Sequence, residues 1–120
     1  SGQLWGLGYQ KGIQAQVDIF GEHMRTAWQK GHINRWLAAN CFGDYYTRGG
    51  LTLAERELIT FCFLMAQGGC EPQLIAHSKG NMRMGNDKDL LLRVVSHCLP
   101  YIGYPRRLNA ISCIRKAVEE

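Results

Sequence analysis

The sequence predicts an all-α protein in which about six helices, joined by short loops, form a bundle. Apolar residues recur at helical spacing, as in Ile13, Val17, Phe20 and Met24. Glycine and proline separate the helical segments, and no run shows the sustained alternation of a half-buried strand. The 120 residues, 46% apolar and 20% charged, have the length and composition of one globular domain. We therefore expect a single domain over residues 1–120.

The first part of the chain holds two predicted helices. One spans about 9–29, with a kink near Gly12 or Gly21 because glycine weakens a helix interior. The second spans about 33–46, and the turn that follows it contains consecutive glycines at 49–50.

The clearest helix is expected at 53–67. Thr52 and Glu55 have the spacing of a capping box, in which a hydroxyl and a carboxylate each satisfy a free backbone donor. From Leu58 to Ala66 the helix is apolar around most of its girth, so this stretch has no solvent face. We expect one side to lie in the core and the other in a subunit interface.

Three further helices complete the prediction. Pro72 fits the first turn of one helix, where its missing N–H leaves no bond unmade, and Gly85 is the left-handed stop of that helix. The next helix is capped by one of the residues 86–87 and ends before Pro100. The last helix opens at Pro105 after a short connector.

Composition argues against several classes of protein. Fourteen basic and ten acidic residues give a net charge of +4, without the basic stripe and stacking aromatics of a nucleic-acid binder. The longest uncharged stretch, 58–70, is too short to span a bilayer, and no signal peptide is visible. The five cysteines form no C-x-x-C pair, so we expect no zinc site. We expect a cytoplasmic protein with neither a nucleic-acid nor a membrane partner.

The residues best suited to chemistry lie between Glu57 and His77. Cys70 precedes the Pro72 helix, whose free N–H groups and positive dipole end favour a thiolate. His77 follows two turns later on roughly the same face, and Glu57 can approach it if the two helices pack antiparallel. The alternative is structural, because a lone helical histidine is often a satisfied structural residue and Glu57 could pair with a surface cation.

Segments spread over about 48–112 match one known pattern in order and spacing. They are 51–59, Gly68-Gly69-Cys70, Leu74-Ile75-Ala76-His77, Asn81, Gly85, 101–105 and Asn109-Ala110. This set resembles the carboxymuconolactone decarboxylase family, which includes the alkylhydroperoxidase D-like proteins. The resemblance implies an all-helical fold around a two-helix hairpin that assembles into trimers or hexamers.

The peroxidase-like branch of that family uses a C-x-x-C pair followed by a histidine, with a glutamate that relays protons. The matching positions here are Cys70, Gln73, His77 and Glu57. Gln73 therefore stands where the second cysteine would be, and the usual disulfide cycle cannot run without that partner.

The decarboxylase branch lacks the cysteine pair and keeps the histidine. The reaction it implies is loss of a carboxylate from a γ-lactone in aromatic catabolism, with a small-molecule carboxylate as substrate and no metal or organic cofactor. His77 is then the expected proton donor or shuttle, oriented by Glu57. Arg48 and Arg56 are candidate carboxylate clamps because a guanidinium binds carboxylates in a bidentate manner, and Gln73 is a further candidate substrate contact.

Two alternatives stay open. One is a thiol antioxidant of the alkylhydroperoxidase D type, an oxidoreductase acting on peroxides through Cys70, with Cys62 and Cys98 as conceivable spatial substitutes for the missing thiol. The other is a non-catalytic oligomeric module in which Glu57 and His77 form a buried structural hydrogen bond.

Overall fold

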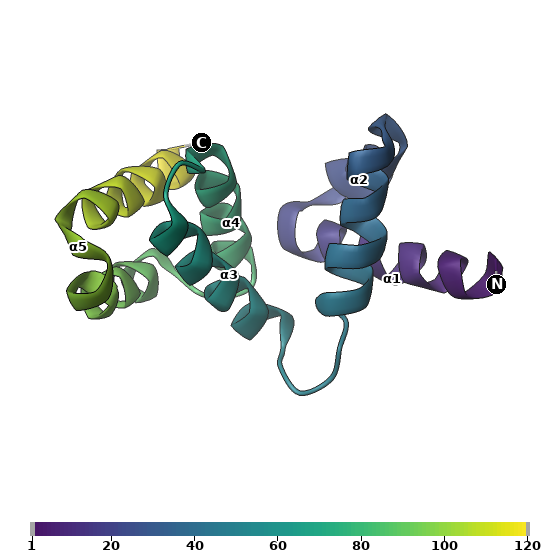
Figure 1. The fold of residues 1–120 in the computed structure, drawn as a ribbon, viewed down its shortest axis with the longest axis horizontal. Coiled ribbons are helices and arrows are strands. Elements are labelled where there is room, and N and C mark those ends of the chain that lie inside the picture. Colours follow the sequence, from purple (N-terminus) through teal and green to yellow (C-terminus); the bar gives the residue numbers. More distant parts are fainter. Residues whose placement is uncertain (1, 120) are drawn as a thin grey trace. The chain divides into compact units, whose positions relative to one another are not determined.

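A computed structural model of the chain describes residues 2–119, and within them the side chains of residues 8–119 (Figure 1). All regular elements of this described part are helical, and it contains no strand, which confirms the all-α prediction. The chain divides into two compact units, Ser1–Leu53 and Ala54–Glu120. Each unit has buried apolar residues of its own, and the single domain stays a prediction.

The first unit contains α1 (Gly2–Phe20), the 3₁₀ helix η1 (Glu22–Lys30), α2 (His32–Trp36) and the π-helix η2 (Leu37–Tyr45). Gly21 has a φ of 116° and separates α1 from η1, so the single helix predicted over about 9–29 is divided at one of the two glycines named for a kink. The helices α2 and η2 follow one another directly, where the sequence predicts a single helix over about 33–46.

The helix α1 continues through Gly12 without a kink, and the glycine at this position serves close packing instead. A Cβ atom on Gly12 would overlap the carbonyl oxygen of Ala38 and lie 2.8 Å from the backbone nitrogen of Gly43. The missing side chain therefore lets the backbones of α1 and η2 meet. The buried apolar residues of this unit are Ala15, Val17, Ile19, Ala27, Ala38, Ala39, Phe42 and Tyr46.

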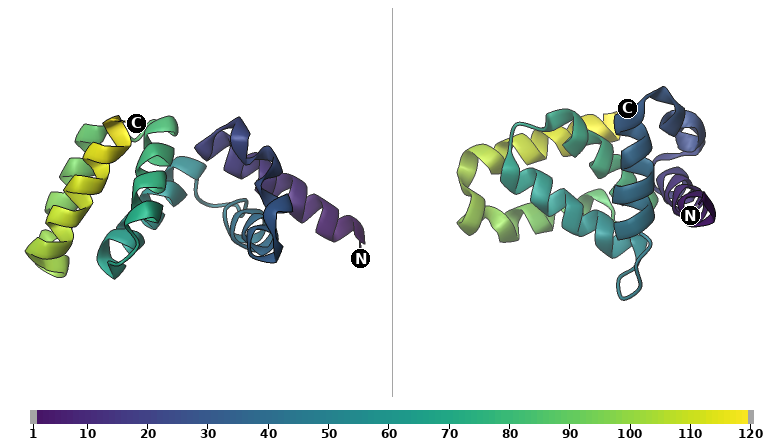
Figure 2. Two further views of the ribbon diagram at one scale, coloured as in Figure 1. Left: turned by 90° about the horizontal axis from the view of Figure 1, so that it is seen from above. Right: turned by 45° about the vertical axis from the view of Figure 1, so that its right-hand side comes forward.

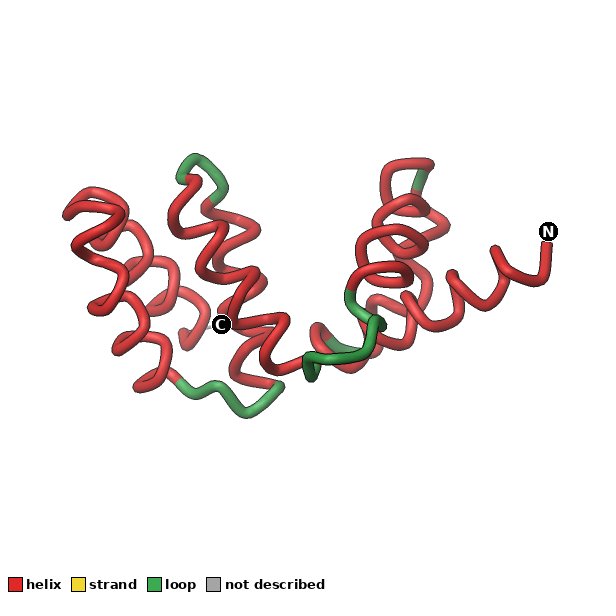
Figure 3. Tube along the Cα trace, turned by 60° about the horizontal axis from the view of Figure 1, so that its bottom comes forward, coloured by secondary structure: helices red, strands yellow, loops and turns green. Residues whose placement is uncertain are grey.

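The second unit contains α3 (Leu53–Gln67), α4 (Glu71–Arg83) and α5 (Lys88–Glu119), joined by short loops (Figure 3). Gly68 and Gly69, with φ of 73° and 70°, turn the chain from α3 into α4, and Gly85 turns it again after α4 with a φ of 97°. Side chains from all three helices form the core: Phe61, Met65, Leu74, Leu91, Val95, Ala110, Cys113 and Ile114.

The long element α5 is two helices joined at one residue. Gly103, with φ of 81° and ψ of 170°, is the one non-helical residue inside it, and there the chain changes direction sharply (Figure 2). The predicted end before Pro100 is therefore wrong, since helical backbone continues up to Gly103. The φ of proline suits a helix, so Pro100 removes a hydrogen bond without ending the helix.

The helix α3 presents apolar residues in two directions. Glu57, Phe61 and Met65 are buried and follow one another at four-residue intervals, which places them on one face. Phe63 is 70% exposed and Ile59 is also exposed. The subunit interface expected at this outer surface stays a prediction. None of the described helices is long and apolar enough to cross a membrane.

Candidate active site

Glu57 of α3 and His77 of α4 are in direct contact. Both carboxylate oxygens of Glu57 lie 2.9 Å from Nδ1 of His77. The Glu57 side chain is fully buried, whereas that of His77 is 16% exposed. The Gly68-Gly69 turn brings the two helices back alongside each other (Figure 1). The structure thus brings together the carboxylate and the imidazole, while their catalytic role stays a prediction.

This contact assigns different tasks to the two ring nitrogens of His77. When Glu57 is ionised, both of its oxygens can only accept hydrogen bonds, and Nδ1 then carries the hydrogen that points at the carboxylate. The neutral ring then has its lone pair on Nε2, which is the nitrogen left to exchange a proton with a ligand.

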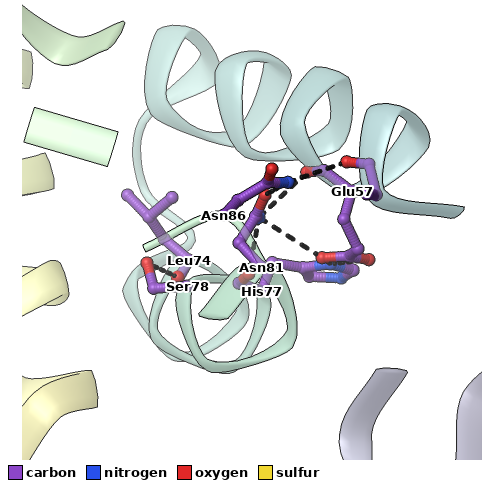
Figure 4. A network of polar contacts seen from close by, with 7 residues as sticks. Glu57, Leu74, His77, Ser78, Asn81 and Asn86 are labelled. Carbon is purple, nitrogen blue, oxygen red and sulfur yellow. Dashed lines mark hydrogen bonds and ion pairs between the residues drawn. The ribbon is translucent and has the colours of Figure 1, made fainter. Parts of the chain in front are cut away.

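Asn81 contacts both members of this pair, and Asn86 contacts Asn81 (Figure 4). The Nδ2 of Asn81 donates to the main-chain oxygens of His77 at 2.7 Å and Glu57 at 3.0 Å, and lies 3.5 Å from Oε2 of Glu57. The Nδ2 of Asn86 donates to Oδ1 of Asn81 and to the main-chain oxygen of Ala54, both at 2.9 Å. Polar contacts therefore link the start of α3, the middle of α4 and the turn after α4.

The thiol of Cys70 differs from the sequence prediction. It lies at the start of α4, makes no capping bond with its side chain, and donates to the main-chain oxygen of Leu64 at 3.3 Å. Burial and the neighbouring charge of Glu71 raise the pKa of Cys70 instead of lowering it. From the sequence we expect a lowered pKa at this helix start, whereas burial and the Glu71 charge act in the opposite direction.

Two further cysteines of the second unit, Cys62 and Cys113, also have raised pKa values. Burial raises the pKa of Cys62 to about 11, and a hydrogen-bonding contact with Cys98 adds to the shift. Burial and the charge of Glu71 also raise the pKa of Cys113. Among the described residues, no group of three or more His, Cys, Asp or Glu side chains is placed to hold a metal ion.

The remaining predicted site residues occupy three different surroundings. Gln73 is exposed in the first turn of α4, and Arg56 is half-buried on α3 beside Glu57 in sequence. Arg48 belongs to the first unit, where it lines an open pocket of about 380 Å³ together with Lys11 and other residues. Their roles in substrate binding stay predictions.

Sequence reasoning missed the part that Asn81 and Asn86 play around the pair. From the sequence, Asn81 was named only as part of the family pattern. It follows His77 by four residues and therefore lies on the same helix face. That spacing was a usable signal. Asn86 carried no comparable signal, because its partners are Ala54, 32 residues away, and a side-chain oxygen whose direction depends on the fold.

The fold and the site together define an all-helical protein in which a helical hairpin holds one imidazole against a buried carboxylate. The chain belongs to the carboxymuconolactone decarboxylase family, whose family model matches residues 32–116. It is similar to the 4-carboxymuconolactone decarboxylase of Acinetobacter baylyi, with 26% identity over 103 residues. That alignment covers 81% of this chain and 76% of the relative.

Proposed function

We propose that the protein is a carboxy-lyase that removes a carboxylate from a small carboxylated lactone, with His77 as the proton donor. The observation that carries this proposal is the fully buried Glu57, whose two oxygens both lie 2.9 Å from Nδ1 of His77. Family membership and the decarboxylase relative support the class of reaction.

The chemistry needs three things from the protein. A cation must orient the substrate carboxylate, and Arg56 and Arg48 are the candidates. When the C–C bond breaks, CO₂ leaves and the electron pair passes into the lactone as an enolate, which must be stabilised. The enolate then takes a proton, which Nε2 of the protonated His77 ring supplies before recovering one from solvent. Glu57 keeps the ring oriented and balances its positive charge during this cycle.

The test is to incubate the protein with γ-carboxymuconolactone and to measure CO₂ release. His77→Gln should abolish release while leaving thermal unfolding close to that of the wild type. His97→Gln is the matched control, because His97 is an exposed histidine on α5 and its loss should leave the rate unchanged. A folded wild-type protein that releases no CO₂ would exclude this substrate.

The same variants separate the non-catalytic alternative. If Glu57 and His77 only stabilise the fold, His77→Gln should lower the unfolding temperature strongly in a protein that has no activity to lose.

The thiol alternative is disfavoured by the raised pKa of Cys70 and its hydrogen bond to Leu64. It requires that Cys70 consume peroxide and form a sulfenic acid. Cys70→Ser should therefore leave decarboxylation intact, whereas rapid loss of peroxide that disappears in this variant would favour the thiol reaction.

We also propose a homo-oligomer, a trimer or a hexamer, with a small carboxylate as its ligand and with neither nucleic acid nor membrane as a partner. The exposed apolar side chains of Ile59 and Phe63 support an interface on α3. Light scattering should give the mass of an oligomer, and Phe63→Glu should lower that mass.

A further inference from the structure

The side-chain amide of Asn81 contacts the main chain of both members of the Glu57–His77 pair. One nitrogen, Nδ2, lies 3.0 Å from the carbonyl oxygen of Glu57 and 2.7 Å from that of His77. The first contact crosses from α4 to α3, and the second stays within α4. Asn81 therefore ties the backbones of the two helices together at the level where the carboxylate meets the imidazole.

Chemistry determines which way this amide faces. Every acceptor near Nδ2 is an oxygen: the two carbonyls and, at 3.5 Å, Oε2 of Glu57. On the other side, Oδ1 of Asn81 accepts from Nδ2 of Asn86 at 2.9 Å. A reversed amide would place oxygen against three oxygens and a donor against a donor, so only the observed orientation is compatible with hydrogen bonding.

The surroundings make this arrangement rigid. Asn81 and Glu57 are both fully buried, so water cannot easily replace a lost contact. Asn86 is itself held by the carbonyl oxygen of Ala54, in the first turn of α3. The hydrogen bonds therefore run from α3 through Asn86 and Asn81 back to α3 at Glu57 (Figure 4).

We infer that Asn81, oriented by Asn86, is a positioning residue that holds the Glu57 carboxylate against Nδ1 of His77 and so keeps the neutral ring in its Nδ1–H form. Without this constraint the carboxylate can turn or withdraw, and the ring gains access to its Nε2–H form. In the proposed reaction Nε2 gives its proton to the enolate and then needs its lone pair to recover one from solvent, and the neutral Nε2–H form has no lone pair there. The inference rests on the role proposed above for His77.

The test reads the tautomer directly and needs no substrate, so it stands apart from the test of decarboxylation. Nitrogen-15 NMR spectra of the neutral imidazole rings distinguish the two tautomers. The chain has four histidines, and the His77→Gln variant identifies which signals belong to His77. In the wild type we expect the Nδ1–H form alone; a predominant Nε2–H form would overturn the inference at once.

Two variants then probe the positioning. Asn81→Leu keeps the branched shape of the side chain and removes the donor. It should lower the ratio of Nδ1–H to Nε2–H by about fivefold or more, since losing a partner in a buried site costs at least about 1 kcal/mol. Asn86→Ala removes only the group that orients Asn81, so a smaller shift in the same direction is expected. Asn86 is half-buried, and this variant decides the matter if Asn81→Leu does not fold.

Ser78→Ala is the matched control. Ser78 is fully buried on the same helix and donates to the carbonyl oxygen of Leu74 at 2.7 Å. Its loss removes a buried hydrogen bond of α4 while leaving the tautomer of His77 unchanged. The inference fails if the Asn81 and Asn86 variants that fold retain the wild-type tautomer, or if Ser78→Ala shifts it equally.

Discussion

Two glycines on α1 should respond in opposite ways to the same substitution. At Gly12, an added Cβ would overlap the carbonyl oxygen of Ala38 and lie 2.8 Å from the nitrogen of Gly43, where ordinary contacts begin at 3.4 Å. At Gly8, four residues earlier in the same helix, an added Cβ would meet nothing within 4 Å. Gly8→Ala is therefore the control for Gly12→Ala.

The magnitudes follow from two effects of opposite sign. Replacing glycine by alanine inside a helix stabilises it by roughly 0.5–1 kcal/mol, and both positions share this gain. The atoms crowded at Gly12 belong to backbone, which cannot move aside as a flexible side chain does. Such overpacking costs about 1–3 kcal/mol. The difference in unfolding free energy between the two variants should therefore be about 1–3 kcal/mol, with Gly8→Ala the more stable.

Urea unfolding followed by tryptophan fluorescence suits this test, because all three tryptophans, Trp5, Trp28 and Trp36, lie in the first unit. Gly8→Ala should move the midpoint to higher urea and Gly12→Ala to lower urea than the wild type. If both variants unfold at the same urea concentration, the close backbone contact between α1 and η2 does not exist in solution.

Three further predictions concern the second unit. Phe61→Ala should lower the unfolding free energy by about 3–5 kcal/mol in circular dichroism, because it empties a fully buried site in the core; a loss below about 1 kcal/mol would contradict that packing. Asp87→Ala should cost about 1 kcal/mol in the same measurement, since Oδ1 of Asp87 accepts from the backbone nitrogen of Leu90 at 2.8 Å, whereas Asp87→Asn should be nearly neutral. With a pKa of about 11, Cys62 should have roughly one thiol in 10⁴ ionised at pH 7. Its alkylation, measured by peptide mass spectrometry, should therefore be slow at pH 7 and accelerate about tenfold per pH unit up to pH 11. Rapid labelling at neutral pH would refute the burial of this thiol.

Local signals predicted much of the fold. The breaks at Gly21 and Gly85 depend on positive φ, which glycine adopts without strain, so the residue type alone marks them. The helix over 53–67 was predicted with its observed bounds because the spacing of Thr52 and Glu55 marks its start and the Gly68-Gly69 pair marks its end. Pro72 lies in the first turn of α4, as its missing N–H requires.

Features that depend on distant partners could not be predicted in the same way. From the sequence alone, Gly12 is expected to weaken its helix, whereas in the structure it allows the backbone of Ala38 to approach closely. The dipole at the start of α4 is a local property that suggests a low pKa for Cys70, whereas the burial that raises this pKa is set by the packed fold. The contact of Glu57 with His77 was predicted conditionally on antiparallel packing, and that packing places the two side chains together.

The spacing of the polar contacts along the chain has a consequence for the order of folding. His77 lies 20 residues from Glu57, Asn81 lies 24 residues from it, and Asn86 lies 32 residues from Ala54. All these contacts close within α3, α4 and their connecting turns, without α5. Closing short loops costs little entropy, and contacts that are near in sequence form early. We therefore expect the hairpin over 54–86 to bring the carboxylate to the imidazole before α5 docks and completes the core.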